Sequence, residues 1–464
     1  MEEESLKKKD KFVKDMTEGE PILLLLEFAI PLLIGNLFQQ AYNLTDSIIV
    51  GRYVGKVALG AVGSTAPITV LIYALTNGLS HGIGIIVAHY YGAKEDNKVK
   101  NTIGNAYYIV PLTAALMGCI SFIFGGYFLK LLNTPKDTFP YAVIYLRTIS
   151  VGFIFTSFFN ILSSILRALG DSKTPLIFLI LSCIFNIFLD LIFVIKFNLG
   201  VMGVGIATAA SQFISAFFCF IYANKSNSYF RLENSDFNFS PEIFFKVVKI
   251  GIPIALQNSF IAISLIALQR VVNEFGSDLV TAYTIVLRIE LFVQYPFMSL
   301  GIALANYTGQ NLGAGKEERV KLGFIRALLC TSAFSIFIFI MFQSFAPIIV
   351  NIFGNDPSVV KYSVIGLKIT CSFYIFLGFI HVTRNLLNGA GETKFSMING
   401  AIECIGRVCL AKPLTMIPII GLNGVWLTTG ITWLLNGLFG IIRYKQGKWK
   451  TISLVNKSNK IMIV

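Results

Sequence analysis

Charged side chains are scarce in this 464-residue sequence: Asp, Glu, Lys and Arg together make up 14% of it, against 55% hydrophobic residues. A soluble globular domain has about 25% charged residues. So low a charged fraction indicates that lipid is the solvent for most of the chain. Because a membrane-spanning helix needs about 20 mostly apolar residues, the chain has room for about a dozen such helices joined by short loops.

The patterns of several enzyme and metal-site classes are also missing. The three histidines form no HxH or HExxH pattern, and the seven cysteines form no CxxC pair. The absence of these patterns argues against a zinc site and a disulfide framework. The Gly82-Ile83-Gly84 stretch has no following Walker lysine. The GLSHG stretch at 78–82 has the letters of GxSxG, but it lies inside an apolar segment and not at a strand-to-helix turn. We therefore expect no ATP-driven transport by this chain alone, no enzymatic activity and no cofactor.

Twelve apolar segments follow one another along the chain, and each is long enough to cross a bilayer as a helix. The segments cover residues 22–50, 58–90, 102–129, 140–166, 175–197, 203–223, 247–272, 280–309, 322–350, 361–387, 395–417 and 423–443. We predict an all-α membrane protein with twelve transmembrane helices.

The two halves of the chain repeat each other. At an offset of 221 residues, LRALGDSK at 166–173 corresponds to LNGAGETK at 387–394, and after a single-residue gap Pro31 corresponds to Pro253. Each half has six segments, an even number that returns the chain to the same side of the membrane. Parallel repeats of this kind are typical of transporters whose substrate site lies between two lobes. We predict two homologous six-helix lobes with a central cleft: an N-terminal lobe at 1–223, a cytoplasmic linker at 224–246, and a C-terminal lobe with a basic tail at 247–464.

The net charge of +13 comes from basic residues gathered in alternate loops. If the twelve segments alternate across the bilayer, most Lys and Arg side chains fall on one side, in both tails and in the loops at 91–101, 167–174, 224–249, 311–321 and 384–394. The opposite loops hold only Arg52, Lys56, Lys130, Lys136, Lys196, Lys361 and Lys412. The positive-inside rule then predicts a protein of the cell (inner) membrane with both termini in the cytoplasm. Since the basic residues act as topological anchors, we expect no nucleic-acid partner.

The first segment carries a polar stripe on an otherwise apolar helix. Asn36, Gln39, Asn43 and Asp46 recur at spacings of three or four residues, and Tyr42 stands one turn before Asp46. Such a stripe cannot face lipid, so it faces partner helices or a water-filled cavity. Gln39 and Asn43 are therefore candidates for lining that cavity. The alternative is that Asp46 is a structural residue near the outer headgroups.

The fifth segment contributes a second polar pair. Asn186 and Asp190 are the strongly polar groups within it and stand at i and i+4, so their side chains share one face. Together with Asp46 they would make an oxygen-rich site for a hard cation such as Na⁺. The same two carboxylates could instead carry a proton, and the residues leave both uses open. Thr208 in the sixth segment could add a hydroxyl group.

The repeat tests whether these carboxylates are needed merely for packing. Asp46 corresponds to Leu268, and Asp190 corresponds to Ala411. If a carboxylate were needed to build a lobe, the C-terminal lobe would be expected to have one as well. Because these carboxylates occur in only one of the two halves, we favour a specialised role for them in the N-terminal lobe.

Other charges within the apolar segments are interpreted as structural. Glu403 and Arg407 are four residues apart on one helix and would neutralise each other. Arg147 and Lys368 occupy equivalent positions of the two halves, which favours an architectural role.

In four stretches the sequence resembles the MATE family, the multidrug and toxic compound extrusion transporters. They are IPLLIGNLFQQAYNLTDSIIVGRYVGKVALGAVG at 30–63, YYGAKEDNK at 90–98, LRALGDSKTP at 166–175 and QNLGAGKEERV at 310–320. The resemblance covers almost all of the chain, and as an ordered set these motifs are specific. It implies twelve helices in two six-helix lobes around a central cleft, and export of organic cations against uptake of Na⁺ or H⁺.

The resemblance also implies a cation site in the N-terminal lobe. The positions that it assigns to cation binding are occupied here by Asp46, Asn186, Asp190 and Thr208, and Tyr42 and Asn160 resemble nearby lining residues. One branch of the family instead has a glutamate in the seventh helix. The corresponding stretch here, 251–269, contains no carboxylate, which argues against a site in the C-terminal lobe.

The leading hypothesis is therefore a cation-coupled multidrug antiporter that works by alternating access, with the lipid bilayer and small organic cations as its partners and a monomer as its functional unit. A flippase for lipid-linked precursors or polysaccharides, of the related superfamily, is the alternative. The acidic N-terminal lobe and the count of twelve helices argue against a flippase. An ion channel would need a repeated filter or a pore ring, and the sequence shows neither.

Overall fold

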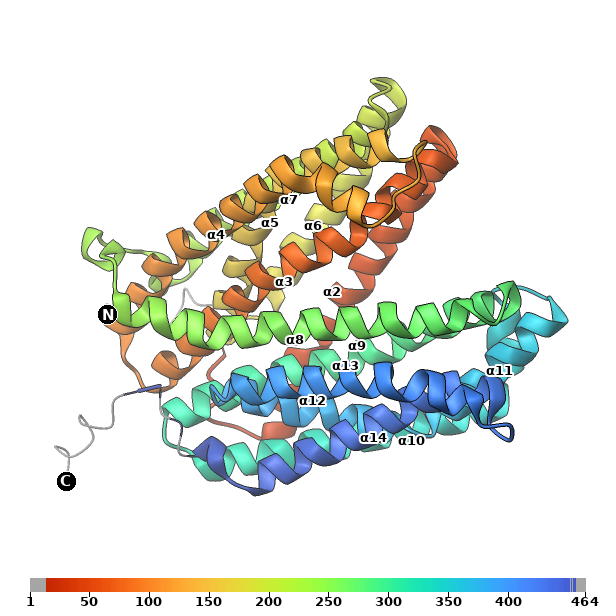
Figure 1. Ribbon diagram of the computed structural model, residues 1–464. Coiled ribbons are helices and arrows are strands. Elements are labelled where there is room, and N and C mark those ends of the chain that lie inside the picture. Colours follow the sequence, from red (N-terminus) through yellow and green to blue (C-terminus); the bar gives the residue numbers. More distant parts are fainter. Residues whose placement is uncertain (1–13, 451, 453, 456–464) are drawn as a thin grey trace. The chain divides into compact units, whose positions relative to one another are not determined.

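The computed structural model describes residues 14–450, 452, 454 and 455, and this part of the chain is built from helices without a β-strand. Six long helices come from the first half of the chain and seven from the second (Figure 1). Their bounds are α2 Pro21–Ile49, α3 Lys56–Gly92, α4 Asp96–Leu131, α5 Phe139–Ala168, α6 Lys173–Asp190, α7 Gly200–Ser226, α8 Pro241–Asn273, α9 Ser277–Gly313, α10 Glu317–Asn351, α11 Pro357–Cys371, α12 Tyr374–Gly389, α13 Thr393–Met416 and α14 Gly424–Lys445. The basic tail residues Lys7, Lys8, Lys9, Lys11, Lys457 and Lys460 lie outside the described residues.

All twelve predicted apolar segments are helical in the structure. The tenth, at 361–387, is divided into α11 and α12, which meet at an angle of 52°. Among the described residues, ten helices are long and apolar enough to cross a membrane, and the α11–α12 pair makes an eleventh span if it is counted as one. The remaining predicted span, α13, contains Lys394, Glu403, Arg407 and Lys412, so its composition is too charged to be recognised by hydropathy alone.

The helices group into two compact units. Unit 1 consists of Ile30–Ala255 together with the described residues up to Met16, and unit 2 consists of Thr17–Ala29 and the described residues from Leu256 onward. The boundaries fall inside α2 and α8, the first helices of the two halves. Pro31 and Pro253 lie within three residues of these boundaries, where a proline removes one backbone hydrogen bond and loosens the helix.

In unit 1, α5 is the central helix and packs against α3, α4 and α7. Small residues allow the close approach of α5 and α7: a Cβ atom added at Gly152 would lie 2.8 Å from the Cβ of Ala209, and one at Gly205 would lie 2.7 Å from Thr148. Interfaces of small residues are typical of membrane helices, whose association depends on van der Waals contact. In unit 2, α9, α12 and α14 surround an aromatic core that includes Trp426 and Trp433.

The linker between the halves is folded onto unit 1. It contains two short 3₁₀ turns, Ser228–Phe230 and Asn234–Phe237. Asn105 of α4 donates a hydrogen bond to the backbone oxygen of Asn238 at 3.0 Å and accepts one from the backbone nitrogen of Ser240 at 2.9 Å. At Gly104 an added Cβ would lie 2.2 Å from the carbonyl oxygen of Asp236, so only glycine permits this contact.

The repeated LGD and AGE motifs end α5 and α12 in the same way. Gly170 has φ +92° and Gly391 has φ +86°, the left-handed conformation that glycine adopts after a helix. The acidic residue that follows has a different partner in each unit. Asp171 accepts hydrogen bonds from the first backbone nitrogens of α6, including that of Thr174 at 2.9 Å, whereas Glu392 forms an ion pair with Arg443.

Candidate functional site

The structure brings the two carboxylates of the first half together in unit 1. Asp46 lies near the end of α2, and Asp190 is the last residue of α6. Their carboxyl groups lie within interaction range of each other. Asp190 is fully buried, at 0% exposure, while Asp46 is half-buried. Two carboxyl groups this close can share one proton, so the pair is suited to hold one exchangeable positive charge.

Two hydroxyl groups extend this cluster. The hydroxyl group of Tyr42, one turn before Asp46, lies within interaction range of the Asp46 carboxyl group and of the Thr208 hydroxyl group of α7. The Thr208 hydroxyl group itself donates to the backbone oxygen of Val204 at 3.0 Å. Three helices therefore meet at this point, and the site has four oxygen-bearing side chains within interaction range.

Asn186 stands one turn before Asp190 on α6 and is buried, with 1% exposure. At this spacing its amide lies on the same helix face as the Asp190 carboxyl group. An amide oxygen on that face is a further ligand of the type that a hard cation prefers.

Tyr145 of α5 also belongs to the cluster and was missed from the sequence. Its side chain is close enough to Asp46, Asp190 and Tyr42 to interact with them electrostatically. It further packs against the apolar cluster at the ends of α2 and α6. Its own segment has no carboxylate or amide at helical spacing from it. Only the packing of α5 against the other helices therefore reveals it.

The other lining candidates do not join the carboxyl pair in the same way. Asn160 donates a hydrogen bond to Asn77 of α3 at 2.8 Å. It is fifteen residues beyond Tyr145 on α5, which corresponds to about 22 Å along a helix, so it forms part of a separate polar contact. Gln39 and Asn43 lie on α2 with exposed side chains, on the stripe that leads to Asp46.

Both helices that carry the carboxylates end in a π-helical turn. α2 continues into Val50–Val54, and α6 continues into Leu191–Lys196. The two turns contact each other, and Val50 and Val194 share a buried apolar cluster with Val201 and Val204. π turns are rare and are frequently found at functional sites. Here they close one end of the carboxyl cluster with apolar side chains.

Unit 2 contains buried charges of a different kind. Arg407 forms an ion pair with Glu403 at 2.9 Å and donates a hydrogen bond from its second terminal nitrogen to Ser264 at 2.7 Å. Glu290 of α9, which the sequence analysis did not single out, is buried nearby and interacts with Arg407. Arg384 is in turn within electrostatic reach of Glu403. Acidic and basic groups therefore balance in this cluster, as a structural ion-pair network requires.

Both halves of the chain match one known protein family. The model of the MatE family matches residues 31–192 and 253–411, one stretch in each half, and the two stretches begin at the repeat-equivalent prolines Pro31 and Pro253. The chain belongs to the MATE family. Its MATE fold has twelve transmembrane helices in two homologous six-helix lobes, and the proteins of this family are membrane transporters.

Relatives of this MATE protein match it over nearly their whole length. It is 30% identical over 448 residues to the probable multidrug resistance protein YpnP of Bacillus subtilis, with 95% of this chain and 98% of YpnP covered. It is 23% identical over 414 residues to the multidrug export protein MepA of Staphylococcus saprophyticus, with 89% of each covered. A solved MOP superfamily transporter from Pyrococcus furiosus superposes with a TM-score of 0.85 at 23% identity, with 95% and 98% covered; the reverse polarity of its binding pocket is said to suggest a different function for it.

Proposed function

We propose that this MATE protein is a secondary active multidrug efflux transporter that exports small organic cations in exchange for Na⁺ or H⁺ by alternating access. One observation carries the proposal: the carboxyl groups of Asp46 and Asp190, 144 residues apart in the chain, lie together inside one unit of a transporter fold. The names of the relatives YpnP and MepA support multidrug substrates.

The chemistry of the pair supports ion exchange. A proton between the carboxyl groups neutralises one of their two charges. A Na⁺ ion would replace the proton and take oxygen ligands from Asp46, Asp190 and Asn186, with the Tyr42 and Thr208 hydroxyl groups beside them. An organic cation that approaches through Gln39 and Asn43 would compete for the same negative charge. Exchange follows if the coupling ion favours one state of the protein and the organic cation favours the other.

We further propose that the protein resides in the cell (inner) membrane as a monomer with both termini in the cytoplasm, as the distribution of basic residues favours. The lipid bilayer and the exported cations are its partners in this proposal, and the coupling ion takes the place of any cofactor. The acidic pair argues against a flippase for lipid-linked phosphates, since the phosphates and the carboxylates would repel each other.

Uptake of a fluorescent organic cation into everted membrane vesicles tests the proposal. Imposed Na⁺ and H⁺ gradients are compared for the wild type and for Asp190→Asn, which keeps the shape of the side chain and removes its charge. We expect uptake by the wild type with one of the two gradients and loss of coupled uptake in the variant. Glu274→Gln is the matched control, because Glu274 is an exposed carboxylate paired with Lys412 in unit 2. Normal coupled uptake by a well-expressed Asp190→Asn protein would overturn the proposal.

A further inference from the structure

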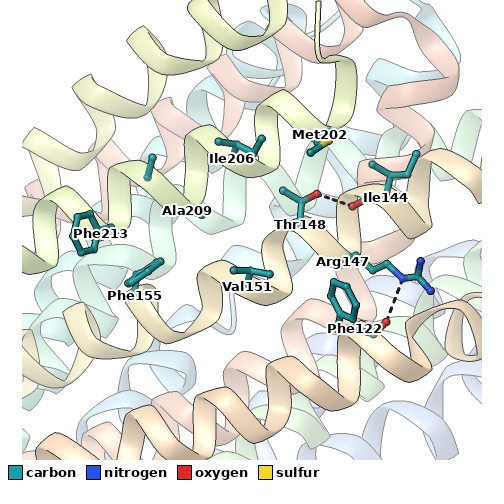
Figure 2. Close-up of a pocket in the computed structure, with 11 residues that line it drawn as sticks. Phe122, Ile144, Arg147, Thr148, Val151, Phe155, Met202, Ile206, Ala209 and Phe213 are labelled. Atoms are coloured by element: carbon teal, nitrogen blue, oxygen red, sulfur yellow. Dashed lines mark hydrogen bonds between the residues drawn. The ribbon is translucent and has the colours of Figure 1, made fainter.

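An apolar groove of about 650 Å³ runs along the surface of unit 1 between α5 and α7 (Figure 2). Phe122 of α4 closes one side of it, and its floor is formed by side chains such as Val151, Ile206 and Ala209. Phe155 and Phe213, whose ring centroids are 5.0 Å apart, close the end nearer the C-termini of both helices. Val151 and Phe213 are exposed by 60% and 47%, although both lie in membrane-spanning helices. Exposed apolar side chains on membrane-spanning helices are suited to contact with the acyl chains of the bilayer.

The other end of the groove carries a single charge, Arg147. Its Nε donates a hydrogen bond to the carbonyl oxygen of Phe122 at 3.3 Å, and its guanidinium group lies over the Phe122 ring at 5.4 Å. These contacts fix the side chain at the rim. Figure 2 shows the two terminal nitrogens pointing away from the Phe122 ring. They retain hydrogen-bond donors that match an anionic oxygen.

The depth of Arg147 suits a lipid headgroup. Arg147 is eight residues after the start of α5, which places its Cα about 12 Å from that end of the helix. A helix of 30 residues is about 45 Å long, against a hydrocarbon core of about 30 Å. If α5 is centred in the bilayer, the Cα lies about 5 Å inside the hydrocarbon boundary, a depth from which an arginine side chain reaches the headgroup level.

We propose that this groove binds one phospholipid with an anionic headgroup, whose phosphate pairs with Arg147 and whose acyl chain lies along Val151 towards Phe155 and Phe213. Because lipid tails and the groove are equally apolar, burial of the acyl chain gives little preference for one lipid over another. The charge of Arg147 therefore determines which lipid is held. Two other occupants fit less well. An organic cation would be repelled by the guanidinium group. A second copy of the protein would bury the charge of Arg147 without a partner.

Native mass spectrometry of the full-length protein in mild detergent tests this site. The probes are phosphatidylglycerol, which is anionic, and phosphatidylcholine, which has no net charge, added at equal concentrations. We expect the wild type to retain one phosphatidylglycerol at least about five-fold more tightly than phosphatidylcholine, as one basic residue near the membrane surface contributes about 1 kcal/mol. Arg147→Gln is expected to lose that preference, and Arg147→Lys to keep most of it.

Two further variants separate a lipid site from a general effect. Val151→Trp fills the groove from an exposed position without changing Arg147, so it is expected to release the bound lipid while the protein stays folded. Lys368→Gln removes the basic residue at the equivalent position of the other half and is expected to leave the preference intact. Equal retention of both lipids by the wild type, an unchanged preference in Arg147→Gln or in Val151→Trp, or formation of dimers in place of lipid binding would overturn the proposal.

Discussion

Removing Arg407 alone is expected to destabilise unit 2 more than removing Arg407 and Glu403 together. The side chains of this ion pair are only 5% and 7% exposed, and they lie 2.9 Å apart. Arg407→Met leaves Glu403 and Glu290 buried without their shared cation, a change that costs about 3–5 kcal/mol. Adding Glu403→Gln removes one stranded charge, and replacement of a whole buried pair is often close to neutral. The double variant is therefore expected to be more stable than Arg407→Met by roughly 2 kcal/mol.

Intrinsic fluorescence during denaturant titration in detergent measures this difference directly. The three tryptophans of the chain are Trp426, Trp433 and Trp449, all of them in unit 2, so the signal reports on the unit that contains the ion pair. The matched control is the exposed pair of Glu274, the residue after α8, and Lys412 of α13, the helix that also carries Glu403 and Arg407. Its neutralisation is expected to change the free energy of unfolding by less than about 1 kcal/mol. A double variant less stable than Arg407→Met would refute the structural interpretation of the buried pair.

Three other predictions concern the carboxyl cluster, the linker and the topology. Tyr42→Phe removes the hydroxyl group beside Asp46, and we expect a loss of about 1 kcal/mol, or roughly five-fold, in affinity for the coupling ion, measured by ion titration of the purified protein. Gly104→Ala forces a methyl group against the linker carbonyl oxygen and is expected to destabilise unit 1 by about 1–3 kcal/mol; unchanged thermal unfolding of this variant would contradict the described packing. Cysteines at Lys98 and Arg319 are expected to resist membrane-impermeant thiol reagents in whole cells, and ready labelling at either position would reverse the proposed orientation.

Apolar runs were sufficient to predict the helices other than α13, because an apolar run of this length has few folded alternatives in a bilayer. The charged α13 was predicted because it occupies the eleventh segment of the repeat. Hydropathy did not predict the break between α11 and α12, since Ser372 and Phe373 between them carry no proline or glycine signal. It likewise gave no sign of the π turns after Asp46 and Asp190. These turns depend on how neighbouring helices pack, and that information is not contained in a local pattern.

The sequence predicted only part of the candidate site, because contacts between helices are not contained in a local pattern. The spacing of Asn186 and Asp190 and the stripe ending at Asp46 could be read from single helices, because a helix face is a local property. The approach of α5, which adds Tyr145, is a tertiary contact. Glu290 could have been noticed as a carboxylate within an apolar run, but only the fold shows that it lies close to Arg407.

Ion titration of three purified proteins most directly tests whether the carboxyl pair of unit 1 holds the coupling ion. Isothermal titration with Na⁺, together with measurement of protons released when an organic cation is added, compares the wild type, Asp46→Asn and the double variant Glu403→Gln with Arg407→Met. We predict that Asp46→Asn sharply weakens Na⁺ binding or proton release, and that the double variant keeps both close to the wild type. If Asp46→Asn retained full coupling while the double variant lost it, the coupling ion would bind in unit 2 and the proposed mechanism would be wrong.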